Sequence, residues 1–553
     1  MRKFLHITFL LSIMGVNGFA QQKTLPDSLR FTIRKEYRPV ARDAKRIIPT
    51  PEVPTDSTTL PAMSYKMLPM RQELGYEVET IEAAQLSNEP LTKLNSGHLK
   101  VGFGNYTMPF FEASFGSLRS RAYEAGGFAR YHASFAKLDG RPFGFTDAGI
   151  DVFGKKFLKA HTLGAKLSYD HDENYFYGYN QEDTTFAKND IRQQFHHVGV
   201  GIDLTTIQDD SKLKVINQAG LNYSYTTDRY SSEEHHVAGN VEAVFRIKKE
   251  KLFGRITGDY YRNDMPTRGL NNGVIGFEPE FRAERKRWSI GLGVNLSLDI
   301  NDSTTKVLVF PVLDFHYFLV QDIFRFYAGA KGGVQRNGLR TNSQTNPYAF
   351  TDLTLSNTWE RLNVFGGFKG TITHAIGYDI SVAQIITGQQ LFWVNDWADS
   401  TGNRFSPEYH DVMITSLKGS LSYQLKEKLQ LVAMAEYRFF TMPSDSIAPW
   451  HEAPFRFMFG GNYNLKDKFI FKASITAMGE RVARGFQSDS TGVSYPNVNL
   501  KGYADVNLGV EYRYRKWLGA FVDFRNIGAI RYELWERYPS QRFSFIAGVH
   551  FSF

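Results

Sequence analysis

Three residues in the segment 387–409 have side chains of the kind that bind sugars or peptides, namely Trp393, Asp396 and Trp397. Aromatic rings stack on the apolar faces of such ligands, and a neighbouring carboxylate fixes their polar groups by hydrogen bonds. We therefore treat these residues as candidate ligand contacts on a surface loop. Aromatic side chains also gather where a membrane meets water, so anchoring at that boundary is the alternative interpretation.

Two histidine pairs, His196-His197 and His235-His236, and the acidic stretch 170–191 are the candidates for metal chemistry. Neighbouring residues on a strand point to opposite faces, so each histidine pair supplies one ligand at most. The acidic stretch lacks the ligand spacing of a calcium-binding EF-hand loop. No Gly-x-Ser-x-Gly nucleophile motif precedes a helix. We therefore predict no catalytic residue, no metal site and no cofactor, and we expect that the protein is not an enzyme.

The last thirteen residues indicate what must position these groups. Apolar residues occupy the odd positions from Phe543 to Phe553, and most even positions are polar or small. Such alternation is typical of a β-strand with one apolar face. A soluble sandwich rarely ends on an uncovered aromatic row, whereas lipid covers that row in a membrane barrel. The ending Val549, Phe551 and Phe553 also resembles the signal that the outer-membrane assembly machinery recognises on bacterial barrel proteins.

From Gly97 onward the chain is a long series of alternating segments separated by connections of two kinds. Short charged turns alternate with longer segments, as in an outer-membrane barrel with tight periplasmic turns and long external loops. The sequence therefore predicts an all-β fold: a large antiparallel transmembrane β-barrel of about 22 strands, within a range of about 16 to 22, over residues 96–553. The predicted long connections are 171–191, 264–272, 337–357, 387–409, 443–452, 482–499 and 530–540.

The predicted strand 500–515 indicates how the barrel wall is oriented. Asp505, Glu511 and Arg513 fall on one face, and apolar residues such as Leu508 and Val510 fall on the other. A charge in the middle of a lipid-facing wall costs roughly 2 to 4 kcal/mol, so the charged face must line the interior. The sequence thus predicts a polar lumen. The slightly negative mean hydropathy of -0.35 agrees with strands that are only half apolar.

The segment before the barrel divides into two parts. Residues 1–20 have a basic start, an apolar core and a small-residue exit, which predicts a secretory signal peptide. Residues 21–95 are proline-rich and polar, which predicts an extended periplasmic segment or a reduced plug inside the lumen. Within it Leu29, Phe31 and Ile33 alternate with polar residues and could add as a strand to the sheet of a periplasmic partner. A linker that touches the barrel rim is the alternative.

Composition excludes several classes. The chain has no cysteine, which excludes disulfides, thiol chemistry and a lipid-anchor cysteine. Its formal charge of +8 comes without a basic helix or an aromatic-basic motif, so we do not expect nucleic-acid binding.

Segments at both ends of the mature chain resemble a known family, namely 37–39, 43–47, 102–106, 132–134, 503–512, 521–527, 532–539 and 547–553. They are similar to TonB-dependent receptors, and in particular to Bacteroidetes outer-membrane barrels that are often given that label. The resemblance implies a barrel of up to about 22 strands in the outer membrane. The chain departs from true receptors because 21–95 is too short for a full plug domain and has no convincing TonB box, Leu29 to Ile33 being the nearest match.

We therefore expect a monomeric barrel in the cell outer membrane, surrounded by outer-membrane lipid, that passes or binds solutes at the cell surface. A periplasmic or TonB-like protein is the expected partner. The alternative function is a scaffold that transports nothing and whose N-terminal segment docks a periplasmic partner.

Overall fold

A computed structural model describes residues 95–138, 140–179, 185–206, 216–247, 249–302, 304–320, 323–396, 401–485, 487–489 and 492–553. The predicted signal peptide 1–20, nearly all of the segment 21–95 and Trp397 lie outside these residues. Leu29, Phe31 and Ile33, the predicted docking strand, lie outside them as well.

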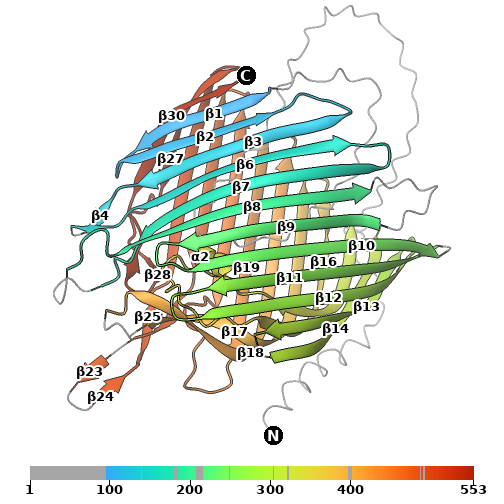
Figure 1. Ribbon diagram of the computed structural model, residues 1–553. Helices are drawn as coiled ribbons and strands as arrows, with labels where there is room; N and C mark the ends of the chain where they lie inside the picture. Colours follow the sequence, from blue (N-terminus) through green and yellow to red (C-terminus); the bar gives the residue numbers. More distant parts are fainter. Residues whose placement is uncertain are drawn as a thin grey trace, which may run out of the picture. The chain divides into compact units, whose positions relative to one another are not determined.

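The described residues form a closed antiparallel sheet of 22 strands (Figure 1), which confirms the predicted all-β barrel. Each strand pairs with the next along the wall, and β30 pairs with both β27 and β1. The strands are β1 (Gly97–Gly104), β2 (Met108–Gly116), β3 (Tyr123–Ser134), β6 (Phe145–Phe157), β7 (His161–Tyr175), β8 (Arg192–Thr206), β9 (Ile216–Asp228), β10 (Glu233–Ile247), β11 (Glu250–Asp264), β12 (Gly269–Glu284), β13 (Trp288–Asn301), β14 (Thr304–Val320), β15 (Phe324–Gln335), β16 (Thr358–Thr373), β17 (Ile376–Asp396), β18 (Arg404–Leu425), β19 (Leu429–Thr441), β20 (Phe455–Leu465), β21 (Phe469–Met478), β26 (Tyr503–Arg515), β27 (Leu518–Arg525) and β30 (Ser544–Ser552).

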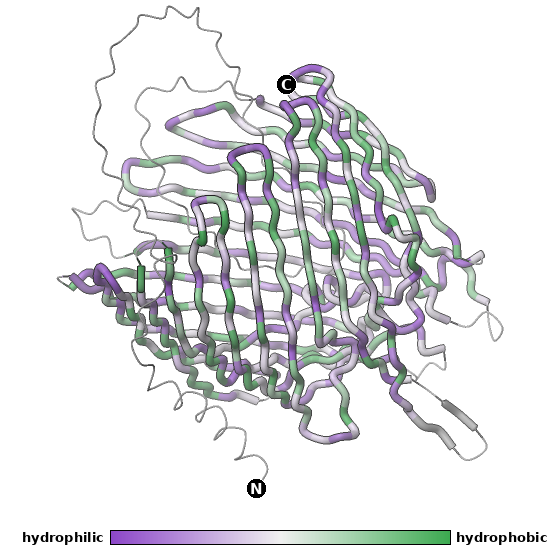
Figure 2. The backbone as a smooth tube through the Cα atoms, turned by 180° about the vertical axis from the view of Figure 1, so that it is seen from behind, coloured by the Kyte–Doolittle hydropathy of each residue, from purple (hydrophilic) through white to green (hydrophobic). Residues whose placement is uncertain are grey.

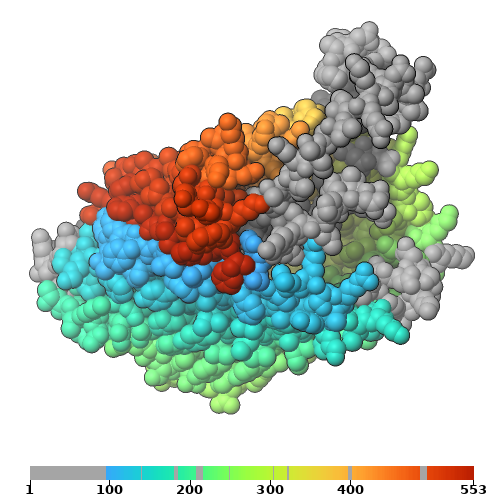
Figure 3. Space-filling view, turned by 90° about the horizontal axis from the view of Figure 1, so that it is seen from above, coloured from blue at the N-terminus to red at the C-terminus, as the bar shows by residue number. Residues whose placement is uncertain are grey.

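The seam between β1 and β30 closes the barrel. Gly97 N–H donates to Phe553 O at 2.8 Å, and Phe553 N–H donates back to Gly97 O at 3.0 Å. Figure 3 shows the first strands in blue directly beside the last strands in red. The assembly-signal residues Val549 and Phe551 lie on β30 opposite Val101 and Leu99. Their recognition by the assembly machinery stays a prediction.

Alternation along each strand sorts side chains between the two surfaces of the wall, and the tube in Figure 2 changes hydropathy residue by residue. On β26, Leu508 is 45% exposed on the outside, whereas Asn507 is 6% exposed on the inside. The apolar exterior matches a lipid-facing wall. In the described part of the chain, no helix is both long and apolar enough to cross a bilayer.

The two ends of the barrel differ. We call the end that holds Gly97 and Phe553 the turn end, because its connections are short, as at 285–287 and 466–468. We call the opposite end the loop end. Among the described residues it carries one short helix and several small hairpins, and Figure 1 labels β23, β24, β25 and β28 at its lower left. These elements are α2 (Leu339–Thr345), β4 (Lys137–Leu138), β5 (Arg141–Pro142), β22 (Arg481–Arg484), β23 (Gln487–Asp489), β24 (Gly492–Ser494), β25 (Asn497–Leu500), β28 (Glu533–Trp535) and β29 (Tyr538–Pro539).

Three predicted long connections are wrong in extent. Most of 387–409 is strand, because β17 runs to Asp396 and β18 begins at Arg404. The connection predicted at 264–272 shrinks to 265–268, and the one predicted at 171–191 begins only after Tyr175. In each case the ladder of backbone hydrogen bonds continues where the alternation that identifies a strand in sequence is lost: polar residues interrupt it at 171–175 and 269–272, and a continuous apolar run interrupts it at 391–394.

Candidate functional site

A single apolar cluster joins connections from all sides of the loop end. It draws on the connections β3–β6, β7–β8, β11–β12, β15–β16, β17–β18 and β27–β30, so the loops converge rather than stand apart. We call this cluster the cap. Its buried members are Ala136, Leu138, Phe143, Tyr175, Phe176, Tyr177, Tyr179, Ile191, Met265, Ala349, Leu353, Leu355, Trp393, Phe405 and Tyr538.

Hydrogen bonds in the cap cross the mouth of the barrel. Asn403, between β17 and β18, donates from Nδ2 to Phe176 O at 3.0 Å, although β7 and β17 lie far apart around the sheet. The Tyr538 hydroxyl donates to Asn403 O. The Tyr177 hydroxyl donates to Pro539 O at 3.1 Å. Because these bonds tie opposite sides of the wall together, the cap covers the lumen between them.

Stacked tyrosines form the centre of the cap. The rings of Tyr348 and Tyr538 stack with their centroids 3.8 Å apart, and Tyr177 meets Tyr538 edge to face at 4.8 Å. Aromatic pairs of this geometry contribute roughly 0.5 to 1.5 kcal/mol beyond the area that they bury. Three different connections supply these three rings, so the stack holds their loops in one position.

His451, in the β19–β20 connection, links two further loops. It is 9% exposed, and its Nδ1 lies 2.9 Å from Trp393 O while its Nε2 lies 3.3 Å from the backbone nitrogen of Glu536. A carbonyl only accepts and a backbone N–H only donates, so Nδ1 carries the proton and Nε2 has none. Burial lowers the pKa of His451 to about 4, in spite of the opposing hydrogen bond to Trp393 O. The ring is therefore neutral at physiological pH.

The side chain of Glu536 carries the opposite perturbation in the same place. It is 7% exposed, and its Oε2 has no hydrogen-bond partner among the described residues. Burial raises the pKa of Glu536 to about 7, against the opposing charge of Arg537. A carboxyl that is half ionised near neutral pH and a neutral histidine thus lie where the β19–β20 and β27–β30 connections meet.

The connection between β15 and β16 folds inward as α2 and attaches to the wall. Glu234, on β10, accepts hydrogen bonds from the backbone N–H groups of Leu339, at 2.6 Å, and Arg340, at 3.2 Å. The guanidinium of Arg340 reaches Asp170 at 2.8 Å and Asp172 at 3.3 Å, both on β7. These contacts attach the helix to the wall at β10 and β7.

Charged side chains line the wall of the lumen. Lys100 pairs with Asp523 at 3.3 Å beside the seam, and Arg255 lies 3.2 Å from Glu242 farther round the wall. Glu511, on the predicted inner face of 500–515, contacts Arg513 at 3.2 Å. The prediction of a polar lumen is confirmed for this wall.

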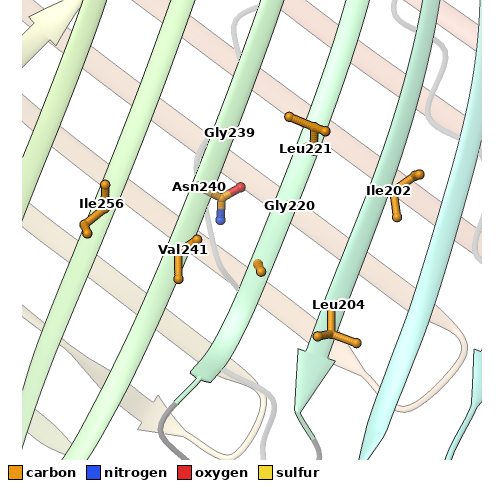
Figure 4. Close-up of a pocket in the computed structure, with 9 residues that line it drawn as sticks. Ile202, Leu204, Gly220, Leu221, Gly239, Asn240, Val241 and Ile256 are labelled. Atoms are coloured by element: carbon orange, nitrogen blue, oxygen red, sulfur yellow. The ribbon is translucent and has the colours of Figure 1, made fainter.

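A shallow groove on the outer surface interrupts the apolar belt (Figure 4). Gly220 and Gly239 lie on its floor, and its sides are apolar, with Leu221 57% and Ile256 54% exposed. A Cβ atom placed on Gly258, the cross-strand neighbour of Gly239, would have no other atom within 4 Å. Hydrocarbon chains fit such a surface, and its apolar lining gives it no chemistry of its own.

The predicted ligand contacts are placed as follows. Trp393 is 4% exposed and packs in the cap, because the strand that carries it continues past the apolar part of the wall, and its role as a ligand contact stays a prediction. Asp396 is the last residue of β17, and its role as a ligand contact stays a prediction, as does that of Trp397.

The histidine pairs point to opposite faces, as their spacing predicts. His196 lies 2.9 Å from the Tyr169 hydroxyl, whereas His197 lies 2.9 Å from Thr226 Oγ1. Among the described residues no group of three or more His, Asp or Glu side chains is arranged to hold a metal ion. The cap was missed by reasoning from the sequence. The signal that could have identified it is the density of aromatic residues within the long connections, as at Tyr175–Tyr179 and Trp535–Tyr538.

Comparisons with known proteins show a shared fold. No protein-family model and no curated protein sequence matches the chain. Among solved structures, the FrpB iron transporter from Neisseria meningitidis is similar with a TM-score of 0.63 and 11% identity, over 84% of this chain and 82% of that one. The ferric-catecholate import receptor Fiu from Escherichia coli K12 gives a TM-score of 0.59 and 9% identity, over 83% and 82% of the two chains.

A third solved structure agrees with these two. The ferric enterobactin receptor PfeA from Pseudomonas aeruginosa, in complex with BCV-L6, gives a TM-score of 0.61 and 12% identity, over 84% and 82% of the two chains. At such identities the likeness shows the fold alone. The described chain therefore has the barrel fold of bacterial iron import receptors.

Proposed function

We propose that this protein is an outer-membrane receptor barrel that binds a solute at the cell surface and admits it to its lumen when the cap opens. The turn end faces the periplasm and the loop end faces outward. The observation that carries the proposal is the cap, which ties opposite sides of the wall together over a lumen lined by charge pairs. A wide barrel without such contacts would be an open pore. A selective receptor therefore needs contacts that close its mouth and that break when the solute is admitted.

The receptor barrels with the same fold support transport as the function. Their titles describe iron transport and ferric-siderophore import, but we assign no particular solute to this chain. We propose further that it acts as a monomer and that residues 21–95 face the periplasm or enter the lumen. Leu29, Phe31 and Ile33 would then form the strand that docks a TonB-like partner.

Single-channel conductance in planar bilayers tests the proposal. The double variant Asn403→Ala with Tyr538→Phe removes two bonds that cross the mouth, so we expect frequent large openings where the unaltered protein is mostly closed. A matched control is Asn464→Ala with Tyr260→Phe, which changes the same residue types at a turn and on the outer wall. A cap variant as silent as the control would contradict the proposal.

The scaffold function is the second candidate. It is favoured by the burial of the aromatic residues of the cap, because burial opposes opening of the mouth. If the mouth never opens, the protein serves to present its N-terminal segment to a periplasmic partner. Conductance of the mature protein and of a chain that lacks residues 21–95 separates the two. An open pore after deletion supports a plug and transport, whereas silence of both correctly folded barrels supports the scaffold.

A further inference from the structure

The short connections at the turn end share an excess of basic side chains. Strand order places these connections on opposite sides of the barrel, since they join β2 to β3, β6 to β7, β10 to β11, β12 to β13, β18 to β19, β20 to β21 and β26 to β27. The connections 321–323 and 374–375 carry no Lys or Arg. We call the exposed Lys and Arg side chains of these connections the basic rim. Figure 2 shows that the turns at the end that holds the C-terminus are mostly hydrophilic.

Most of the charge on the basic rim is not neutralised locally. At the β12–β13 turn Lys286 and Arg287 are exposed, and Arg285 alone of this run is paired, with Glu250. At the β20–β21 turn Lys466 and Lys468 flank a single acidic residue. The same arrangement recurs at 426–428. Since basic residues outnumber acidic ones in each of these connections, each carries a net positive charge.

Aromatic side chains accompany the basic rim at the same level of the wall. The guanidinium of Arg285 lies 5.6 Å from the centre of the Trp288 ring, and that of Arg515 lies 5.5 Å from the Tyr514 ring. Trp517, in the β26–β27 turn, is 53% exposed. Amphipathic rings next to basic groups are the usual composition of a membrane boundary, where the rings reach the headgroup level.

We propose that the basic rim binds anionic phospholipid headgroups of the membrane leaflet that surrounds the turn end. The inference rests on the membrane placement proposed above. A soluble acidic protein would contact one arc of the rim, whereas its basic connections lie on opposite sides of the barrel, and a lipid leaflet is the partner that reaches all of them. Basic residues beside an anionic leaflet are attracted within about one Debye length, roughly 8 Å at physiological salt.

The loop end provides the contrast. Its exposed basic residues, among them Arg229, Lys501, Arg531 and Arg542, come from three connections and alternate with acidic ones such as Glu533. The asymmetry predicts that only the turn end selects anionic lipid.

Electron spin resonance of spin-labelled lipids tests the inference on the full chain in phosphatidylcholine bilayers. We expect labelled phosphatidylglycerol to associate with the protein roughly twofold or more tightly than labelled phosphatidylcholine in low salt. The rim variant changes Lys286, Arg287, Lys466 and Lys468 to Gln and should lose a large part of this preference. The control variant changes Arg229, Lys501, Arg531 and Arg542 to Gln and should keep it.

Raising the salt from about 0.05 to 0.5 M should weaken the preference of the unaltered protein, because it shortens the Debye length. Equal association of both lipids with the unaltered protein, or equal losses in both variants, would overturn the inference. Binding of soluble polyglutamate without any lipid preference would assign the rim to a soluble partner instead. A protein that immobilises neither lipid would refute the membrane placement, and with it the proposed function.

Discussion

The opposite pKa shifts of His451 and Glu536 predict that pH acts on the closure of the cap in two opposing ways. We compare the closed cap with an open one in which both side chains reach water. Opening restores the ordinary pKa of His451, 6.5, from about 4, and that of Glu536, 4.5, from about 7. Each shift of about 2.5 units corresponds to about 3 kcal/mol between the two protonation states.

The two contributions have opposite signs. Below pH 6.5 the open cap binds a proton on His451 that the closed cap does not, so closure weakens as the pH falls, by about 2 kcal/mol at pH 5. The closed cap holds the proton of Glu536 up to pH 7, so closure strengthens as the pH falls from 7.5 to 5, also by about 2 kcal/mol. We therefore expect the unaltered cap to be nearly insensitive to pH in this range.

Single substitutions should reveal the contribution of each residue to the pH dependence of closure. Glu536→Gln removes the carboxyl, so closure should weaken about 30-fold from pH 7.5 to 5. In the His451→Gln variant, closure of the cap should instead strengthen over the same interval, by a similar factor. Hydrogen exchange of peptides 443–454 and 530–542, corrected for intrinsic rates, measures the opening equilibrium. The reasoning is refuted if the Glu536→Gln variant is as insensitive to pH as the unaltered protein, or if the His451→Gln variant still weakens in acid.

Three further predictions concern the mouth and the seam. Arg340→Ala breaks both contacts of α2 with β7 and should raise the conductance in planar bilayers, whereas Arg340→Lys should raise it less. Gly548→Val would drive its Cβ into the backbone of β1 and should abolish the heat-modifiable folded band on gels, while Gly258→Val, which faces open space, should change stability by about 0.5 kcal/mol or less. Deletion of Phe553 should lower the amount of folded barrel in outer membranes, measured by the same gel shift.

The wall could be predicted from the sequence because its physics is local. Each strand has a period of two, and the turns between 426 and 428 or 466 and 468 are marked by charged residues at the ends of apolar runs. A lipid face and a polar face leave little choice of register, since a slip of one residue would place Glu511 and Arg513 in the belt. The strand number and the polar lumen follow from this alternation.

The cap could not be predicted, because nothing in a connection's own sequence records which connection it meets. Asn403 and Phe176 bond across the mouth although 227 positions separate them. Trp393 has the composition of a surface ligand contact, yet its ring is buried because its strand continues beyond the belt. Such contacts depend on the diameter and closure of the barrel, which only the whole sheet defines.

The seam also constrains how the molecule can be made. His98 pairs with Ser552, so the first strand must wait for the last one before either gains its second neighbour. Until β30 is in place, β1 offers an unpaired edge to any other extended chain, and contacts so distant in sequence form slowly. We therefore expect that a chaperone that shields this edge during export raises the yield of folded protein.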